Sequence, residues 1–365
     1  MKKIVLTGGG TAGHVTPNIA LLPKLKEAGY SISYIGSYDG IEKKLIEECH
    51  IPYHGISSGK LRRYFSWKNF TDPFRVLAGF GQARTILRKI NPDIVFSKGG
   101  FVSVPVVLAA KKLKIPVIIH ESDITPGLAN KIAMRSASKI CCNFPETLSY
   151  LPKERAVLTG SPIRQELFLG NKENGLTLCS FHTEKPVLMI IGGSIGSVFI
   201  NNSIRQILPE LTKDFQIVHI CGKGNVSKEH EHVDGYKQFE YVSSELPDLF
   251  AASNLVISRA GANVICELLA LNKPNLLIPL SASSSRGDQI LNAHSFEKQG
   301  FSMVLLQEDL TPETLLSSIR TLHSKEEEFK ANLSQSNQGN AVEKVFTLIE
   351  STHKQHRKKP HRTTS

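Results

Sequence analysis

The chain has 365 residues, of which 41% are hydrophobic and 21% charged, and its 44 Lys and Arg against 33 Asp and Glu give a net charge of +11. This balance excludes a disordered, collagen-like or disulfide-stapled protein, and the length predicts about two domains. The six cysteines form no CxxC pair, which argues against a zinc ribbon and for reduced, buried thiols.

The apolar stretch at the N-terminus is too short for a signal peptide, and no apolar run approaches the roughly 18–20 residues that span a bilayer. We therefore expect a cytoplasmic protein. The charge is uneven: residues 1–164 hold 24 Lys and Arg against 11 Asp and Glu, whereas the remainder holds 20 against 22. A basic half favours an anionic partner, such as nucleic acid, a membrane surface or a phosphorylated substrate, although a solubility bias would look the same.

In the first half, predicted strands alternate with helices. An apolar strand at 2–7 leads into a glycine-rich turn at 8–14 and then a helix at 17–28 that ends at Gly29. Further strands are predicted at 30–36, 93–97, 116–120 and 139–142. Strands and helices that alternate at this spacing predict parallel βαβ units.

The second half repeats the pattern. A strand at 186–191 leads into a glycine loop at 192–197 and a helix at 198–211. Strands follow at 216–221, 255–258 and 275–279, with a helix at 264–271. We therefore predict an α/β protein with two Rossmann-like domains, each with a parallel sheet, that face a shared cleft.

The predicted domains span residues 1–162 and 163–340. A helix at about 341–352 is expected to pack back on the first domain. Residues 353–365, with five Lys or Arg and three His, are predicted to be a basic disordered tail, with a weak electrostatic tether to an anionic surface as the alternative.

The first glycine loop, with Gly8, Gly10 and Gly13, matches the GxGxxG dinucleotide pattern. However, the second strand ends without the acidic residue that would hold a ribose, and Asp39 lies just beyond it, so a nicotinamide dehydrogenase remains only an alternative. The glycines could also serve the tight turn alone. At the second loop, backbone amides and a helix start would suit a diphosphate.

A third motif, SRAGAN at 258–263, follows a strand and opens a helix. Glu267 lies four residues after Asn263 on the same helical face, where its carboxylate could accept hydrogen bonds from the two hydroxyls of a ribose. Arg259 and nearby amides could take phosphate oxygens. The alternative for Glu267 is a helix-dipole contact or a buried ion pair. The polar loop at 281–289 suits the hydroxyls of a sugar.

Together these motifs resemble the MurG family of undecaprenyl-diphospho-muramoylpentapeptide β-N-acetylglucosaminyltransferases, which have the GT-B fold. The resemblance runs over GGGTAGHVTP (8–17), KGGFVSVP (98–105), HESDITPGLANK (120–131), TGSPIR (159–164), GGSIGS (192–197), SRAGANVICE (258–267) and RGDQILNA (286–293). It implies inverting transfer of N-acetylglucosamine from UDP-N-acetylglucosamine to the C4 hydroxyl of the muramoyl sugar in a lipid-linked muramoyl-pentapeptide, during peptidoglycan synthesis. It also implies a peripheral enzyme at the cytoplasmic face of the cell membrane.

The resemblance implies a set of contacts to UDP-N-acetylglucosamine. These are Thr11, Ala12, Gly13, Asp123, Arg164, Ser194, Val242, Arg259, Gly261, Ala262, Asn263, Glu267, Gln289 and Asn292. Ser194, Arg259 and residues 261–263 would meet the diphosphate, Glu267 the ribose, Gln289 the sugar hydroxyls, and Val242 the uracil through its backbone. At Asp123 the chain departs from the family, some members of which have asparagine there.

An inverting displacement needs a base for the acceptor hydroxyl and stabilisation of the departing UDP. His14 is the expected base, placed by the first glycine loop and titrating near neutrality. It could instead order the loop or position the acceptor diphosphate, with Glu121 and Asp123 as reserve bases. His120 is expected to be structural. The chain contains no Asp-x-Asp, so we expect no obligatory metal and no cofactor.

Residues 59–70 interleave four basic residues with four aromatic ones, a composition typical of contact with anionic lipid. The expected membrane contacts are Arg62, Arg63, Phe65, Trp67 and Phe70. Core packing is the alternative; stacking on single-stranded nucleic acid gains no support from two glycine-loop domains, so no nucleic-acid partner is expected. For the whole chain, the alternatives are another GT-B UDP-sugar glycolipid transferase, a UDP-N-acetylglucosamine epimerase, and a non-catalytic scaffold that binds the lipid intermediate.

Overall fold

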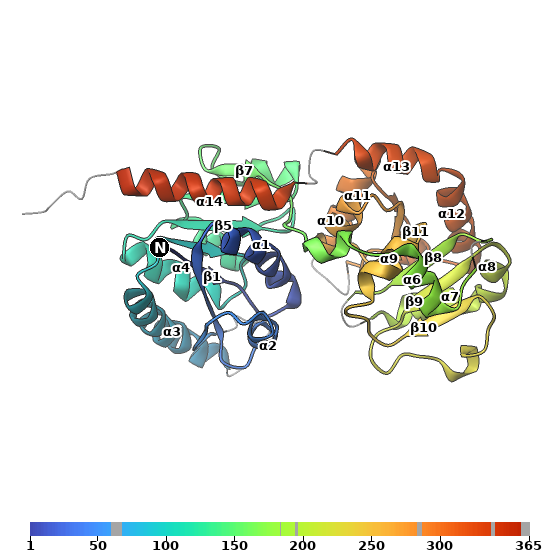
Figure 1. Ribbon diagram of the computed structural model, residues 1–365, viewed down its shortest axis with the longest axis horizontal. Coiled ribbons are helices and arrows are strands. Elements are labelled where there is room, and N and C mark those ends of the chain that lie inside the picture. Colours follow the sequence, from blue (N-terminus) through green and yellow to red (C-terminus); the bar gives the residue numbers. More distant parts are fainter. Residues whose placement is uncertain (60–67, 183, 194–195, 283–286, 337–339, 359–365) are drawn as a thin grey trace, which may run out of the picture. The chain divides into compact units, whose positions relative to one another are not determined.

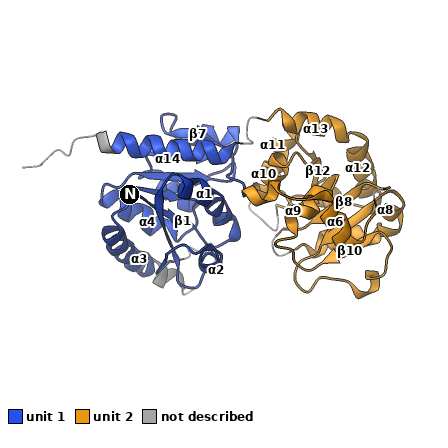
Figure 2. Cartoon of the chain, viewed as in Figure 1, with its two compact units in different colours: residues 1–164, 340–365 blue, residues 165–339 orange. Residues whose placement is uncertain are grey.

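The computed structural model describes residues 1–59, 68–182, 184–193, 196–282, 287–336 and 340–358. The chain divides into two compact units, the first formed by residues 1–164 and 340–365 and the second by residues 165–339 (Figure 2). Each unit contains one parallel sheet with helices, so the prediction of two α/β units with parallel sheets is confirmed. Within the described ranges, no helix is both long and apolar enough to cross a membrane.

The first unit is built on a seven-stranded sheet with the order β3-β2-β1-β4-β5-β6-β7 (Figure 1). Its strands are β1 (Lys2–Thr7), β2 (Tyr30–Ser37), β3 (Tyr53–Ile56), β4 (Ile94–Ser97), β5 (Val117–Glu121), β6 (Lys139–Cys142) and β7 (Ala156–Leu158). Its helices are η1 (Ala12–His14), α1 (Thr16–Glu27), α2 (Ile41–Glu47), α3 (Lys68–Ile90), α4 (Ser103–Lys112), α5 (Leu128–Ala133), η2 (Pro145–Tyr150) and α14 (Ala341–Lys358). The strand order reverses between β1 and β4, which is where ligands bind in open α/β sheets.

Alternate residues of the strands in the first unit feed two separate cores. Val5 and Val95 join one core with α3, α4 and α5, whereas Ile4 and Ile94 join the other with α1, α2 and α14. This follows from the geometry of a strand, in which successive side chains point to opposite faces of the sheet. Because both faces are covered, the strands read as nearly continuous apolar runs, which is why the sequence located them well.

The second unit has a six-stranded sheet with the order β10-β9-β8-β11-β12-β13. Its strands are β8 (Val187–Ile191), β9 (Gln216–Ile220), β10 (Tyr236–Phe239), β11 (Leu255–Ser258), β12 (Asn275–Leu277) and β13 (Met303–Val304). Its helices are η3 (Gln165–Phe168), α6 (Lys172–Cys179), α7 (Val198–Gln206), α8 (Leu208–Asp214), η4 (Lys228–His230), α9 (Leu246–Ala252), α10 (Ala262–Ala270), α11 (Asp288–Lys298), η5 (Gln307–Asp309), α12 (Pro312–Ser324) and α13 (Glu326–Ser334). Here the order reverses between β8 and β11.

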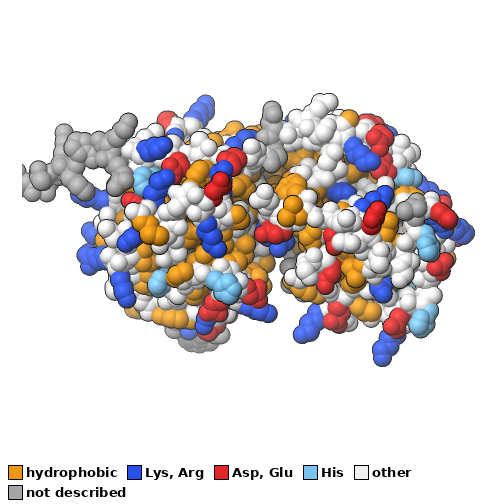
Figure 3. Space-filling model, viewed as in Figure 1, with side chains coloured by type: hydrophobic (Ala, Val, Ile, Leu, Met, Phe, Trp, Pro, Cys, Tyr) orange, Lys and Arg blue, Asp and Glu red, His pale blue; other side chains and the backbone are white. Residues whose placement is uncertain are grey.

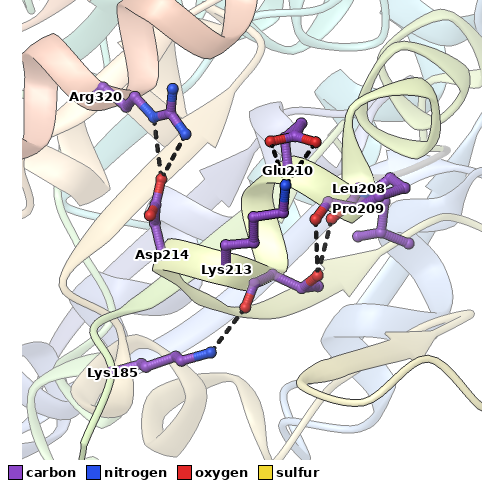
Figure 4. Close-up of polar contacts among 8 residues, drawn as sticks. Lys185, Leu208, Pro209, Glu210, Lys213, Asp214 and Arg320 are labelled. Carbon is purple, nitrogen blue, oxygen red and sulfur yellow. Dashed lines mark hydrogen bonds and ion pairs between the residues drawn. The ribbon is translucent and has the colours of Figure 1, made fainter.

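The predicted single helix at 198–211 is wrong, because the structure has two helices, α7 and α8, with a break at Ile207. Pro209 stands in the first turn of α8. Proline has no N–H to donate to the preceding turn, so one continuous helix is disfavoured. Figure 4 shows how α8 is held: Asp214 accepts hydrogen bonds from Arg320 of α12, and Lys185 donates to the Thr212 carbonyl.

The helix α14 follows the second unit in sequence but packs on the first, against α1, β4 and β6 (Figure 2). Val345 and Ile349 are fully buried in the core that contains Ile4 and Leu6. Near the middle of α14, Glu350 accepts hydrogen bonds from Lys2 Nζ at 2.8 Å and the Tyr30 hydroxyl at 2.6 Å. The helix continues to Lys358, so the prediction of a disordered tail is wrong for residues 353–358, and residues 359–365 lie outside the described part.

Candidate functional site

The first glycine loop lies at the carboxyl end of β1. It runs from Gly8 to the short helix η1, which ends at His14. A side chain on Gly8 would place its Cβ 2.5 Å from the His14 carbonyl oxygen, so the loop folds tightly back on itself. His14 is half-buried, and its Nδ1 lies 3.1 Å from the Thr11 hydroxyl. When Nδ1 carries the proton and donates it to Thr11, Nε2 is left as the acceptor.

Glu42 of α2 lies against this loop and is fully buried. Its carboxylate accepts hydrogen bonds from the Gly10 amide at 3.1 Å, from the Ser37 amide at 3.1 Å and from the Ser37 hydroxyl. A Cβ on Gly9 would collide with the same carboxylate, so glycine is required there for close approach. Glu42 therefore fixes the loop that carries His14.

Lys98, which follows β4, is 1% exposed and extends the sheet through its amide, which donates to the Thr7 carbonyl. Its ammonium lies 2.7 Å from His120 Nδ1 and donates to the Ser122 hydroxyl. His120 Nε2 lies 2.9 Å from the Gly160 carbonyl oxygen, which can only accept. Nε2 therefore carries the proton and Nδ1 accepts from Lys98. Burial and then Lys98 hold the pKa of His120 well below its ordinary value, which fits its expected structural role.

Glu121, a reserve base, is 4% exposed at the end of β5, and its carboxylate is occupied. It accepts hydrogen bonds from the backbone amides of Ser122, Asp123 and Gly127 and from the Asn130 side-chain amide, at 2.8–3.1 Å. Four donors on one carboxylate are a structural arrangement that holds the 122–127 loop and the start of α5. Asp123 is half-buried in that loop, and its carbonyl accepts from the Thr147 hydroxyl.

The pKa of His14 is lowered to about 4, not near neutrality as the sequence suggested. Burial of the ring is the largest cause and the positive charge of Lys98 the second, while a backbone hydrogen bond with Gly9 and the charge of Glu42 act in the opposite sense. At pH 7 the imidazole is uncharged. In this state it suits a proton acceptor better than a cation that holds a diphosphate.

In the second unit, the glycine loop follows β8. Gly193 has a φ of 94°, a conformation that favours glycine. Ser197 caps α7, and its hydroxyl accepts hydrogen bonds from the Ile200 amide at 3.3 Å and from Arg259 Nη2 at 2.8 Å. Backbone amides and a helix start thus meet at the carboxyl end of β8, an arrangement suited to an anion.

Arg259, predicted to take phosphate oxygens, is 6% exposed and engaged within the protein. Besides Ser197, its guanidinium donates to the carbonyls of Ile278 and Pro279, both at 3.1 Å, and to Gln307 Oε1 at 2.8 Å. These groups come from the glycine loop, the segment after β12 and η5. Arg259 therefore holds three loops of this edge together.

The other predicted donor contacts of the second unit gather around α10 and α11. Gly261 caps α10, and a Cβ there would meet only the Val264 side chain, at 4.0 Å. Ala262 and Asn263 begin the helix, and Glu267 lies half-buried further along it. Gln289 Oε1 accepts from the Leu280 amide at 3.1 Å. Asn292 is fully buried and donates to the Ala260 carbonyl at 3.3 Å, which ties α11 to the loop before α10.

The remaining predicted residues belong to the first glycine loop, to the segment after β10 and to the junction between the two units, or lie outside the described residues. Val242 is buried after β10, in the second unit. In the first unit, Thr11 is exposed beside the half-buried Ala12 and Gly13, and Arg164 is half-buried at the end of the linker. Ser194, Arg62, Arg63, Phe65 and Trp67 lie outside the described residues, and Phe70 is described only as part of the backbone of α3.

Sequence reasoning missed Glu42 and gave Lys98 no role. Lys98 could have been found as a charged residue directly after an apolar strand, but nothing in the local sequence marks Glu42. Within the described ranges, no three His, Cys, Asp or Glu side chains gather in a way that could hold a metal ion.

Comparisons of sequence agree with the division into two units. The model of the glycosyltransferase family 28 N-terminal domain matches residues 4–142, and that of the family 28 C-terminal domain matches residues 187–349. A protein of Lachnospira eligens is 66% identical over 354 residues, covering 97% of this chain and all of its own length. One of Lachnoclostridium phytofermentans is 62% identical over 350 residues, covering 96% and 99%. Both are named UDP-N-acetylglucosamine–N-acetylmuramyl-(pentapeptide) pyrophosphoryl-undecaprenol N-acetylglucosamine transferase.

Solved structures share the fold. MurG of Acinetobacter baumannii matches with a TM-score of 0.77 and 26% identity, over 96% of this chain and all of that chain. The UDP-GlcNAc 2-epimerase of Neisseria meningitidis bound to UDP-GlcNAc matches with a TM-score of 0.68 at 14% identity, over 96% of this chain and all of that one. At that identity the second likeness concerns the fold alone.

Proposed function

The chain belongs to glycosyltransferase family 28, and we propose that it transfers N-acetylglucosamine from UDP-N-acetylglucosamine to the muramoyl sugar of an undecaprenyl-diphospho-muramoyl-pentapeptide, as a step of peptidoglycan synthesis. The observation that carries the proposal is the 66% identity to a transferase of that name over nearly the whole of both chains. The two glycine loops, each at the carboxyl end of a central strand, are sites at which such a protein would hold phosphorylated substrates.

The donor is assigned to the second unit. Amides of the 192–193 loop and the start of α10 face the diphosphate, Glu267 accepts hydrogen bonds from the ribose hydroxyls, and Gln289 meets the sugar. Support comes from the positions of the glycine loop and of the start of α10, which follow β8 and β11, two neighbouring strands of one parallel sheet. Arg259 contributes by holding the loops, since its guanidinium is already engaged.

The reaction is an inverting displacement at the anomeric carbon. The C4 hydroxyl of the acceptor attacks, its proton passes to the unprotonated ring nitrogen of His14, and the bond from the anomeric carbon to the UDP oxygen breaks as the new glycosidic bond forms. The charge left on UDP is stabilised by backbone amides and the helix start. The assignment rests on the position of His14 at the end of the first glycine loop and on its uncharged imidazole, which has a free lone pair at pH 7. Glu121 is a poorer base, since four donors already occupy its carboxylate.

The first unit is assigned to the cytoplasmic face of the membrane, where the lipid-linked acceptor resides. The basic and aromatic segment at 59–70 and the start of α3 would form the contact with anionic lipid. In support, Phe74 and Leu77 of α3 are 73% and 66% exposed, lie on one face of the helix and stand beside the exposed Arg75. Hydrophobic side chains reach the surface of the first unit among basic ones on the face shown in Figure 3.

The test of the activity is incubation with labelled UDP-N-acetylglucosamine and the lipid-linked muramoyl acceptor, followed by extraction of lipid. Label in the lipid fraction that depends on the acceptor is expected. A reaction with donor alone distinguishes the epimerase, because that enzyme would yield the 2-epimer of the sugar nucleotide without an acceptor. No label in lipid, or epimer without acceptor, would contradict the proposal.

For the base, the change His14→Ala should lower turnover by about 10²–10⁴-fold. Affinity for UDP should stay unchanged.

For the membrane contact, the double change Phe74→Ser with Leu77→Ser should weaken sedimentation with anionic vesicles. The exposed Leu169→Ser in the second unit is the matched control.

A further inference from the structure

Two charged side chains that no step of the proposed reaction uses lie against the loop that carries His14. Glu42 is fully buried and accepts from the Gly10 amide, and a Cβ on Gly9 would collide with its carboxylate. Lys98 is 1% exposed, and a Cβ added to Gly8 would lie 3.3 Å from the Cβ of Lys98. The loop therefore packs against the buried Glu42 carboxylate at one residue and against the first side-chain carbon of the buried Lys98 at another.

Each charge is held in a fixed position. Three donors, two of them backbone amides, hold the Glu42 carboxylate. The Lys98 ammonium is held by His120 and Ser122, and His120 is fixed in turn by the Gly160 carbonyl. Burying a charge is costly, and apolar residues of similar volume often serve stability as well or better. Two such charges beside one histidine therefore point to a role beyond packing.

The other titratable groups around the loop are uncharged at neutral pH. His120 is neutral, with its proton on Nε2. The Tyr34 hydroxyl on β2 donates to the Gly8 carbonyl at 3.0 Å, and burial raises its pKa above the ordinary value. Tyr53 on β3 stacks on Tyr34, and burial followed by the charge of Glu42 raises its pKa as well. The charges that act on His14 are those of Lys98 and Glu42.

We propose that Lys98 and Glu42 are positioning residues for His14: their fixed charges act on the buried imidazole in opposite senses and adjust the pH range in which it can accept a proton. The inference rests on the proposed function, in which His14 is the base. Lys98 disfavours the imidazolium, so its loss should make His14 easier to protonate, whereas Glu42 favours the imidazolium, so its loss should make His14 harder to protonate.

The experiment compares Lys98→Met and Glu42→Gln, which remove charge at similar volume. The pKa of His14 is measured by NMR titration of the imidazole in the full chain, with its signal assigned by its loss in His14→Ala. Lys98→Met should raise the midpoint by about one pH unit, and Glu42→Gln should lower it. Lys112→Met on α4 and Glu47→Gln on α2 are exposed matched controls and should leave it unchanged. Turnover should fall at low pH as the base becomes protonated, and the pH of this fall (the acid limb) should move with the midpoint in each variant.

Opposite shifts are the decisive result, because general damage to the loop would move both variants in one direction. Unchanged midpoints, or two shifts in the same direction, would overturn the inference. If one variant fails to fold, the other still decides, because a midpoint equal to that of the unaltered chain would overturn the role of the charge that it removes. Lys98→Arg, which keeps the charge, should also keep the low midpoint.

The same experiment separates this inference from the proposed function. Midpoints that shift while the acid limb of turnover stays in place would show that the two charges act on His14 but that His14 is not the base. Lipid-dependent transfer without any shift would leave the function standing and reject the positioning role.

Discussion

Donor affinity should depend strongly on Glu267. Its carboxylate would accept hydrogen bonds from two ribose hydroxyls, and hydrogen bonds to a charged group are stronger than those between neutral groups. It lies half-buried on α10, whose first residues belong to the proposed diphosphate site. Glu267→Ala should weaken UDP binding by about 1.5–3 kcal/mol, roughly ten- to hundredfold, with the fold intact. Titration calorimetry measures this, with the exposed Glu210→Ala on α8 as the control. Unchanged affinity would remove Glu267 from the site.

Replacing Arg259 should mainly lower the stability of the second unit, and it should weaken UDP binding as a consequence. Lysine cannot reproduce a planar guanidinium that reaches Ser197, two carbonyls and Gln307. Arg259→Lys should therefore lower the free energy of unfolding by about 1–3 kcal/mol and weaken UDP binding. Arg320→Lys, at an exposed ion pair on α12, should cost under about 1 kcal/mol. A variant that loses UDP binding at unchanged stability would instead indicate direct contact with the ligand.

The hydrogen-bond partners of Arg259 are an example of side-chain contacts that the sequence alone does not predict. The motif that contains Arg259 was found from its position after a strand, but the groups that engage it come from residues 197, 278, 279 and 307. Contacts between segments so far apart depend on how the strands are ordered in the sheet. The low pKa of His14 was missed for the same reason, since it depends on burial and on Lys98, 84 positions further along the chain.

Among the elements, the central strands were predicted to within one or two residues, while the edges were not predicted at all. Strands β3, β7, β10 and β13 are two to four residues long and mostly only partly buried. An edge strand with so few buried residues leaves no apolar run to detect. With helices covering both faces of each sheet, β1, β4, β5, β8 and β11 are mostly apolar and buried, and β1 and β8 lead into the two glycine loops.

The loop between β5 and α5 provides a prediction at this scale. Glutamine at position 121 would present an N–H₂ group to donors that now meet a carboxylate oxygen. Glu121→Gln should therefore destabilise the loop, lowering the free energy of unfolding by about 1–3 kcal/mol and reducing turnover. The pH profile of the remaining activity should keep its shape. Loss of the acid limb in this variant would instead identify Glu121 as the base.

For the molecule as a whole, the return of the chain to the first unit is the feature with the largest energetic consequence. Ile349 is fully buried between α14 and the sheet. Ile349→Ala should cost the first unit about 2–4 kcal/mol, the usual range for a buried aliphatic side chain cut to alanine. The exposed Thr347→Ala on the same helix should change stability by under about 0.5 kcal/mol. UDP binding should survive both changes, because the buried core of the second unit, as far as its residues are described, is formed by residues 188–329 and includes none of α14.

Glu350 of α14 makes the stability of the first unit depend on pH. Partial burial of Glu350 acts to raise its pKa, but hydrogen bonds from Lys2 and Tyr30 outweigh this effect and lower it. A carboxyl whose pKa is lower in the folded than in the unfolded chain stabilises the fold above its ordinary pKa, and this stabilisation is lost as the pH falls through the folded value. Amide hydrogen exchange of peptides from β1 and α14 should therefore speed up as the pH drops below about 4.5, after correction for intrinsic exchange. Glu350→Gln should show faster exchange at pH 7 and a smaller further change in acid, because glutamine cannot titrate. Equal acid sensitivity in both chains would place the titrating group elsewhere.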